Sequence, residues 1–177
     1  MEMNKQNNLL ELFYQQYLKE KPDQIFLKSL KNLENKFTWK ETYLNILKLS
    51  EELSSFIENK DRCLLISENR PEWMISDLAI MLSKGITVPA YTTYVERDYE
   101  YLINDCNPSV VIVSDSLQYN KIKNIVKSKP FIKISLILNI FPNNIPNNMA
   151  IIAVEMGLLV YPISSIPTML FIPCDKV

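Results

Sequence analysis

Short apolar runs and longer amphipathic segments alternate along most of this chain. Residues 63–66 are a short apolar run, residues 71–83 are apolar around most of a helical circumference, and residues 86–89 are a second short run. Such a sequence of runs predicts a strand, a helix and a strand. Because the first strand leads into the helix and the helix returns to a second strand, the expected unit is a right-handed crossover with parallel strands.

Local signals at the ends of the central helix agree with this interpretation. Pro71 suits the first helical position, where a missing N–H costs nothing, and Glu72 places a carboxylate beside the positive end of the helix dipole. Gly85 is expected to take the left-handed conformation that ends a helix. A helix with so few polar positions is expected to be buried on more than one side.

The alternation begins before this unit. An amphipathic helix is expected over residues 9–19, and residues 25–30 are expected to form an edge strand that makes a hairpin through the turn at 31–36. Thr38 and Glu41 then match a capping box, which predicts a helix that reaches Asn59.

The alternation also continues after the central unit. The further expected elements are a helix over residues 96–106, a strand over 110–113, a helix capped by the Ser-Asp-Ser run at 114–116 and a strand over 132–140. The whole pattern predicts an α/β fold: a doubly wound, mainly parallel Rossmann-like sheet with helices on both faces.

The composition changes past residue 140. Residues 141–148 are rich in Asn and Pro, as in a linker, and Glu155 is the only charged residue in 149–172. That stretch has the length of a membrane helix, but it contains two prolines and lacks a basic flank before it. We therefore expect an α/β subdomain over residues 1–140 and a Pro-rich apolar tail, disordered or aberrant, over residues 141–177.

The bulk composition excludes several kinds of chemistry. The net charge is −1 and histidine is absent, so neither a nucleic-acid footprint nor the commonest general base is present. The three cysteines are far apart, which argues against a zinc site or disulfide framework and fits a reducing, cytoplasmic compartment. With two glycines, the chain has no Gly-rich loop to cradle a phosphate.

Three weaker candidates have simpler interpretations. The loop at residues 91–94 follows a strand, where open α/β sheets bind ligands, but packing and turn chemistry are favoured there. The row of Lys121, Lys123 and Lys127 could touch phosphate, although a solvated helix face is favoured. Ser67 lacks the glycines of a nucleophile elbow, so an ordinary serine at a strand end is favoured. The residues therefore assign no catalytic, cofactor-binding or metal-binding position.

Five blocks of sequence nevertheless resemble a known family. The block Ser-Glu-Asn-Arg-Pro-Glu-Trp at residues 67–73 is the most specific, and the others lie at residues 37–41, 77–80, 85–91 and 101–106. In this order they resemble the amino-terminal region of AMP-forming acyl-CoA synthetases, and most closely the long-chain fatty-acid CoA ligases of the adenylate-forming superfamily. The resemblance covers roughly residues 26–140.

The resemblance implies an enzyme that joins a fatty acid to ATP with Mg²⁺, releases pyrophosphate, and passes the acyl group to coenzyme A. In that family the phosphates are held by a Ser/Thr/Gly-rich loop with a Lys, a Tyr-Gly-x-Thr-Glu block and a lysine of a mobile carboxyl-terminal domain. None of these motifs occurs in this sequence. No site residue is therefore carried over, and this fragment is expected to bind no cofactor alone.

Three hypotheses follow. The first is an amino-terminal fragment of a long-chain fatty-acid CoA ligase, inactive alone, with apolar surface exposed where the missing carboxyl-terminal subdomains dock, and with a tail that reflects a truncated or frame-disrupted copy. The second is an independent Rossmann-like binding or interaction module without catalysis. The third is an adaptor tethered to a membrane through residues 149–172. Weak contact with a membrane surface is compatible with the first hypothesis.

Overall fold

The computed structural model describes residues 8–138, and the tail expected over residues 141–177 lies outside them. At the centre of the described part is a four-stranded sheet in the order β4-β3-β5-β6. Its strands are β3 (Arg62–Ile66), β4 (Ile86–Ala90), β5 (Val110–Val113) and β6 (Ile134–Ile137). All neighbouring strands are parallel, as the sequence predicts.

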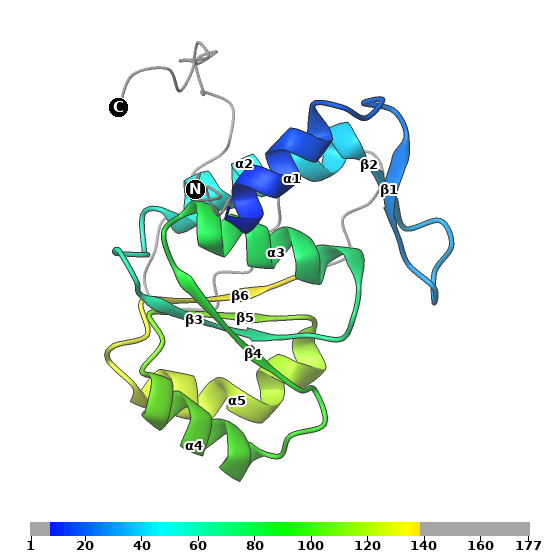
Figure 1. The fold of residues 1–177 in the computed structure, drawn as a ribbon. Coiled ribbons are helices and arrows are strands. Elements are labelled where there is room, and N and C mark those ends of the chain that lie inside the picture. The colour runs from blue at the N-terminus through cyan, green and yellow to red at the C-terminus, as the bar shows by residue number, and fades with distance from the viewer. Residues whose placement is uncertain (1–7, 139–177) are drawn as a thin grey trace, which may run out of the picture.

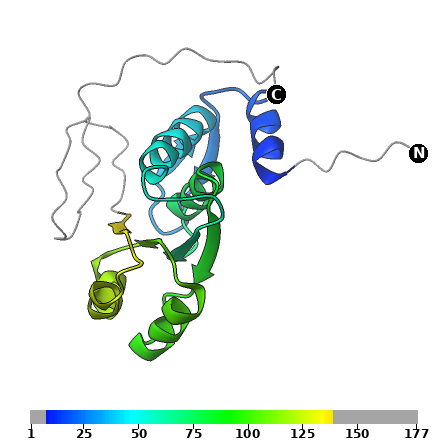
Figure 2. The same cartoon turned by 90° about the vertical axis from the view of Figure 1, so that its left-hand side faces the viewer.

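Helices cover both faces of this sheet (Figures 1 and 2). On one face lie α2 (Trp39–Leu53) and α3 (Pro71–Leu82), with α1 (Leu9–Tyr17) outside them, and on the other lie α4 (Glu96–Cys106) and α5 (Ser116–Ser128). The chain moves one way from β3 to β4 and the other way to β5, so right-handed crossovers place α3 and α4 on opposite faces. The doubly wound architecture is therefore confirmed.

Each central strand contributes to two separate cores. In β3, Cys63 and Leu65 pack with α2 and α3, whereas Leu64 and Ile66 pack with α4 and α5. Successive side chains of a strand point to opposite faces, so a strand covered on both sides must be apolar at every position. This is why the uninterrupted apolar runs identify the strands so clearly.

The expected hairpin is confirmed, as β1 (Ile25–Lys28) pairs antiparallel with β2 (Lys36–Thr38). These two strands form a sheet of their own, so β1 is not an edge of the four-stranded sheet. Aromatic rings join the hairpin to the helices. Phe26 stacks on Trp39 with ring centroids 3.7 Å apart, and Phe13 of α1 lies 5.9 Å from Trp39.

The capping box at the start of α2 is also confirmed. The Glu41 backbone N–H donates to Thr38 Oγ1 at 3.1 Å, and the Thr38 N–H donates to Glu41 Oε2 at 2.8 Å. The helix ends at Leu53 instead of Asn59. The N–H groups of Phe56 and Ile57 both donate to the Leu53 carbonyl in a tight turn, and Ile57 still reaches the core.

The prediction for Gly85 is wrong. The left-handed residue after α3 is Lys84, with φ of 66°, and Gly85 itself does not have a left-handed φ. A Cβ on Gly85 would lie 3.0 Å from Ile80 Cγ2 and 3.2 Å from Cys63 Sγ. Glycine is therefore required here for close packing between α3 and β3.

Candidate functional site

The connections of the sheet single out one place on its carboxyl edge. From β3 the chain passes first to β4 on one side and later to β5 on the other, so the direction of winding reverses between β3 and β5. In open α/β sheets, ligands bind outside the carboxyl ends of the strands at this switch point. Residues 67–70 follow β3 and residues 114–115 follow β5, and these residues form the candidate site.

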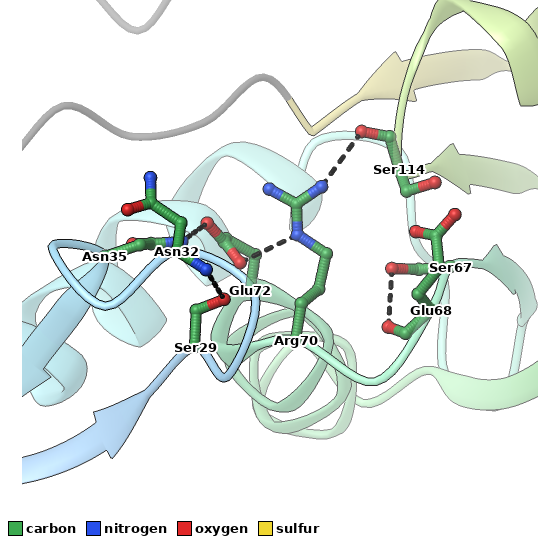
Figure 3. Close-up of polar contacts among 8 residues, drawn as sticks. All are labelled: Ser29, Asn32, Asn35, Ser67, Glu68, Arg70, Glu72 and Ser114. Atoms are coloured by element: carbon green, nitrogen blue, oxygen red, sulfur yellow. Dashed lines mark hydrogen bonds and ion pairs between the residues drawn. The ribbon is translucent and has the colours of Figure 1, made fainter.

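An ion pair joins the two sides of the switch point (Figure 3). Arg70 Nε donates to Glu72 Oε2 at 2.8 Å, and Arg70 Nη1 donates to the Ser114 carbonyl at 3.4 Å. From the hairpin, Asn35 Nδ2 donates to Glu72 Oε1 at 2.9 Å. The Glu72 side chain is fully buried and that of Arg70 is 18% exposed. The Arg70–Glu72 pair therefore connects the hairpin, the start of α3 and the end of β5.

Both members of the pair are held in their charged forms. Burial raises the pKa of Glu72, but the hydrogen bonds from Arg70 and Asn35 outweigh it and bring the pKa below its ordinary value of 4.5. The pKa of Arg70 is raised, chiefly by its hydrogen bond to Glu72. From the sequence, Glu72 is a helix-start carboxylate within the block at residues 67–73, and no local rule connects it with Asn35.

The two serines of the switch point are used differently. The Ser67 hydroxyl donates to the Glu68 carbonyl at 3.0 Å, so it bonds within its own loop. The Ser114 backbone N–H donates to the Ile66 carbonyl at 2.9 Å, which places the residue directly beside the end of β3. Its side chain is buried, and its hydroxyl has no hydrogen-bond partner among the described residues.

The loop at residues 91–94 lies at the carboxyl end of β4, and side chains of α4 and α5 donate hydrogen bonds to its backbone carbonyls. Tyr99 Oη donates to the Tyr91 carbonyl at 2.7 Å, and burial raises the pKa of Tyr99 to about 12. Lys121 Nζ donates to the Thr92 carbonyl at 2.6 Å. The prediction of a wholly solvated lysine row is therefore wrong for Lys121, although Lys123 and Lys127 are exposed.

The described residues do not fit an ATP–magnesium site by themselves. Within residues 8–138 there is no group of three or more His, Cys, Asp or Glu side chains that could hold a metal ion. The N-terminus of α5 is capped by the Asp115 carboxylate, which accepts from the Gln118 N–H at 2.9 Å where a phosphate would otherwise bind. The assignment of no catalytic, cofactor-binding or metal residue to this chain stays a prediction.

Along residues 8–138, every helix is too short or too polar to cross a bilayer. The stretch at 149–172 falls outside the described residues.

Known proteins match most of this chain. The family model of the AMP-binding enzymes matches residues 14–152. A long-chain-fatty-acid–CoA ligase of Homo sapiens is 33% identical over 86 residues, which are 49% of this chain and 12% of the relative. The corresponding ligase of Rattus norvegicus is 30% identical over 77 residues, 44% of this chain and 11% of the relative. A mitochondrial malonate–CoA ligase of Bos taurus is 30% identical over 81 residues, with 42% and 14% covered.

Solved structures share the fold. An anthranilate CoA ligase in complex with anthranoyl-AMP superposes with a TM-score of 0.65 at 19% identity, over 76% of this chain and 26% of that one. A mutant form of coronafacic acid ligase from Pectobacterium brasiliense superposes with a TM-score of 0.67 at 16% identity, with 76% and 26% covered. The chain thus spans about a tenth of the curated ligases and about a quarter of these structures.

Proposed function

The chain belongs to the AMP-binding enzyme family, and from that premise we propose that residues 1–140 form the first α/β layer of an AMP-forming long-chain fatty-acid CoA ligase. The intact enzyme would convert a fatty acid, ATP and CoA, with Mg²⁺, into acyl-CoA, AMP and pyrophosphate. Residues 141–177 would form a separate tail. We place the enzyme in the cytoplasm, in peripheral contact with membranes.

The observation that carries this proposal is the position of the block at residues 67–73. This block, the most specific part of the family resemblance, begins where β3 ends and runs into the first turn of α3. It therefore lies at the switch point, and its Arg70 and Glu72 form the buried pair that fixes the edge of the sheet. Curated ligases for long-chain fatty acids are similar to 44% and 49% of this chain.

The proposed role of this layer is that of a scaffold at the carboxyl edge of the sheet, because the described residues at the switch point form no phosphate cradle. Arg70 donates hydrogen bonds to Glu72 and to the Ser114 carbonyl, and the Asp115 carboxylate caps the start of α5. The remaining subdomains of the ligase would supply the groups that bind ATP and stabilise the charge that develops in the transition state. We therefore expect no adenylation by this chain alone.

A pyrophosphate-exchange assay tests the proposal. The purified chain is incubated with ATP, Mg²⁺, palmitate and labelled pyrophosphate, with an intact long-chain fatty-acid CoA ligase as the positive control. We expect exchange by the control and none by the chain. Exchange that rises with the concentration of the purified chain would show that residues 1–177 hold a complete adenylation site, and the scaffold role would be wrong.

A second candidate function is an independent binding module without catalysis. It is favoured by the coverage of the sheet, since α2 and α3 bury one face and α4 and α5 bury the other. Thermal melting with ATP, CoA or palmitoyl-CoA discriminates the two. A saturable rise in the melting temperature with one of these ligands favours the module, and unchanged melting favours the scaffold.

A further inference from the structure

The turn between β1 and β2 presents two leucines to solvent. Leu30 is 93% exposed and Leu33 is 62% exposed, which makes Leu30 the most exposed large hydrophobic side chain of the described residues. The hairpin projects sideways from the helical layer, away from the four-stranded sheet (Figure 1). Both leucines therefore lie in the turn at the end of this projecting hairpin.

The turn that carries these leucines is ordered by its own hydrogen bonds. The Asn32 N–H donates to Ser29 Oγ at 3.2 Å, and the Ser29 N–H donates to the Asn35 carbonyl at 2.8 Å. The end of the turn is anchored in the protein, because the Asn35 side chain is buried and bonded to Glu72 (Figure 3). A defined turn, held at its base, thus keeps Leu30 and Leu33 out of the core.

The charges around the two leucines are mostly positive. Residues 28–36 contain three exposed lysines and one acidic residue, a net charge of +2 in a chain whose net charge is −1. The lysines are Lys28, Lys31 and Lys36. Two exposed leucines flanked by lysines are complementary to an anionic bilayer, whose headgroups are negatively charged and whose acyl chains are apolar.

We propose that this hairpin tip, residues 28–36, is a membrane-docking element whose leucines enter the interfacial region while its lysines contact anionic headgroups. A protein partner fits less well, because a hairpin turn with two leucines offers far less area than the roughly 1,200 Å² of a stable interface. Docking to a bilayer requires only that the end of the hairpin enter the interfacial region. The inference names the surface that would make the peripheral membrane contact proposed above, and it does not depend on the ligase activity.

Vesicle sedimentation with the full chain tests the proposal. Vesicles contain equal amounts of phosphatidylcholine and phosphatidylglycerol, or phosphatidylcholine alone. The matched pairs of variants are Lys28→Gln/Lys31→Gln against Lys123→Gln/Lys127→Gln, and Leu30→Ser against Leu117→Ser, which removes a leucine that is 72% exposed on α5. Melting curves of all four variants establish that each remains folded.

We expect tighter binding to the anionic vesicles than to the neutral ones. The hairpin lysine pair should weaken binding roughly 25-fold, about fivefold per lysine, and Leu30→Ser should weaken it about tenfold. The α5 variants should bind as the wild type does. The proposal would be overturned if the wild type did not bind, if the hairpin variants bound as tightly as the wild type, or if binding fell equally in the α5 variants. Any membrane contact would then belong to another segment.

A fluorescence measurement adds an independent readout. Tryptophan is introduced at the tip by Leu30→Trp and, as a control, on α5 by Leu117→Trp. The emission of the tip variant should shift to shorter wavelength with anionic vesicles and be quenched by brominated acyl chains, with no such change in the control. Quenching restricted to the α5 variant, or to neither, would exclude insertion of the hairpin tip.

Discussion

Replacing Glu72 with glutamine should destabilise the protein strongly, although the side chains have the same shape. The carboxylate is fully buried and receives hydrogen bonds from Arg70 and Asn35. Glutamine can still accept from Asn35, but it leaves the Arg70 guanidinium without its counter-charge. Breaking a buried pair in this way costs about 3–5 kcal/mol. Because Arg70 keeps some contact with water, we expect about 3 kcal/mol.

The pH dependence of this loss has a defined sign. The pKa of Glu72 is lower in the folded state than its ordinary value of 4.5. A lowered carboxyl pKa stabilises the folded state above the unfolded pKa, and this stability is lost as the pH falls through the folded pKa. Glutamine does not titrate. The difference in unfolding free energy between wild type and Glu72→Gln should therefore be largest at neutral pH and shrink in acid below 4.5.

Urea unfolding followed by circular dichroism measures these differences at neutral and acidic pH. Arg70→Met and the double variant complete a cycle, in which the double variant should lose less than the sum of the single losses. Glu52→Gln is the control, because burial raises the pKa of Glu52 and its charge should not stabilise the fold at neutral pH. A loss below about 0.5 kcal/mol for Glu72→Gln, or a loss that persists in acid, would refute the assignment of a stabilising buried pair.

Three further predictions concern other parts of the fold. Lys121→Met should cost about 1–2 kcal/mol and speed amide exchange in the loop at 91–94, because it removes a charged donor to the Thr92 carbonyl; exchange as slow as in a Lys123→Met control would show that the loop needs no such anchor. Gly85→Ala should destabilise by about 1–3 kcal/mol through contact with Ile80, whereas Lys84→Gly should stabilise by about 0.5–1 kcal/mol. Chemical denaturation that gives the opposite order would show that Gly85, and not Lys84, is the left-handed residue. The double variant Tyr91→Ser/Leu117→Ser, at positions 73% and 72% exposed, should bind less of a hydrophobic dye and stay soluble at higher concentration. Dye binding equal to that of wild type would show that these two side chains are not part of the exposed apolar surface expected where further subdomains dock.

Local patterns predicted the fold because they act over a few residues. The Thr38 and Glu41 side chains satisfy backbone groups three residues apart, so the start of α2 can be identified from sequence. The four apolar positions of β5, residues 110–113, indicate a strand covered on both faces. In both cases the physical constraint and the sequence signal cover the same short segment.

The candidate site was harder to predict because its contacts join distant segments. Asn35 and Glu72 are 37 residues apart, and Lys121 lies 29 residues from Thr92. The end of α3 was also mispredicted because the deciding contacts are tertiary. Gly85 packs against Ile80 and Cys63, and the left-handed conformation falls on Lys84. Two sequence signals fell on the buried pair, the resembling block at residues 67–73 and a carboxylate at the start of an almost wholly apolar helix, and neither indicated Asn35 as a partner.

The strand order has a consequence for synthesis on the ribosome. β3 emerges first of the four parallel strands, β4 pairs with it, β5 pairs with its other side, and β6 pairs with β5. Each newly translated strand thus meets a neighbour that has already been made. The sheet can grow strand by strand as the nascent chain lengthens, and it never has to keep a gap open for a strand still to come.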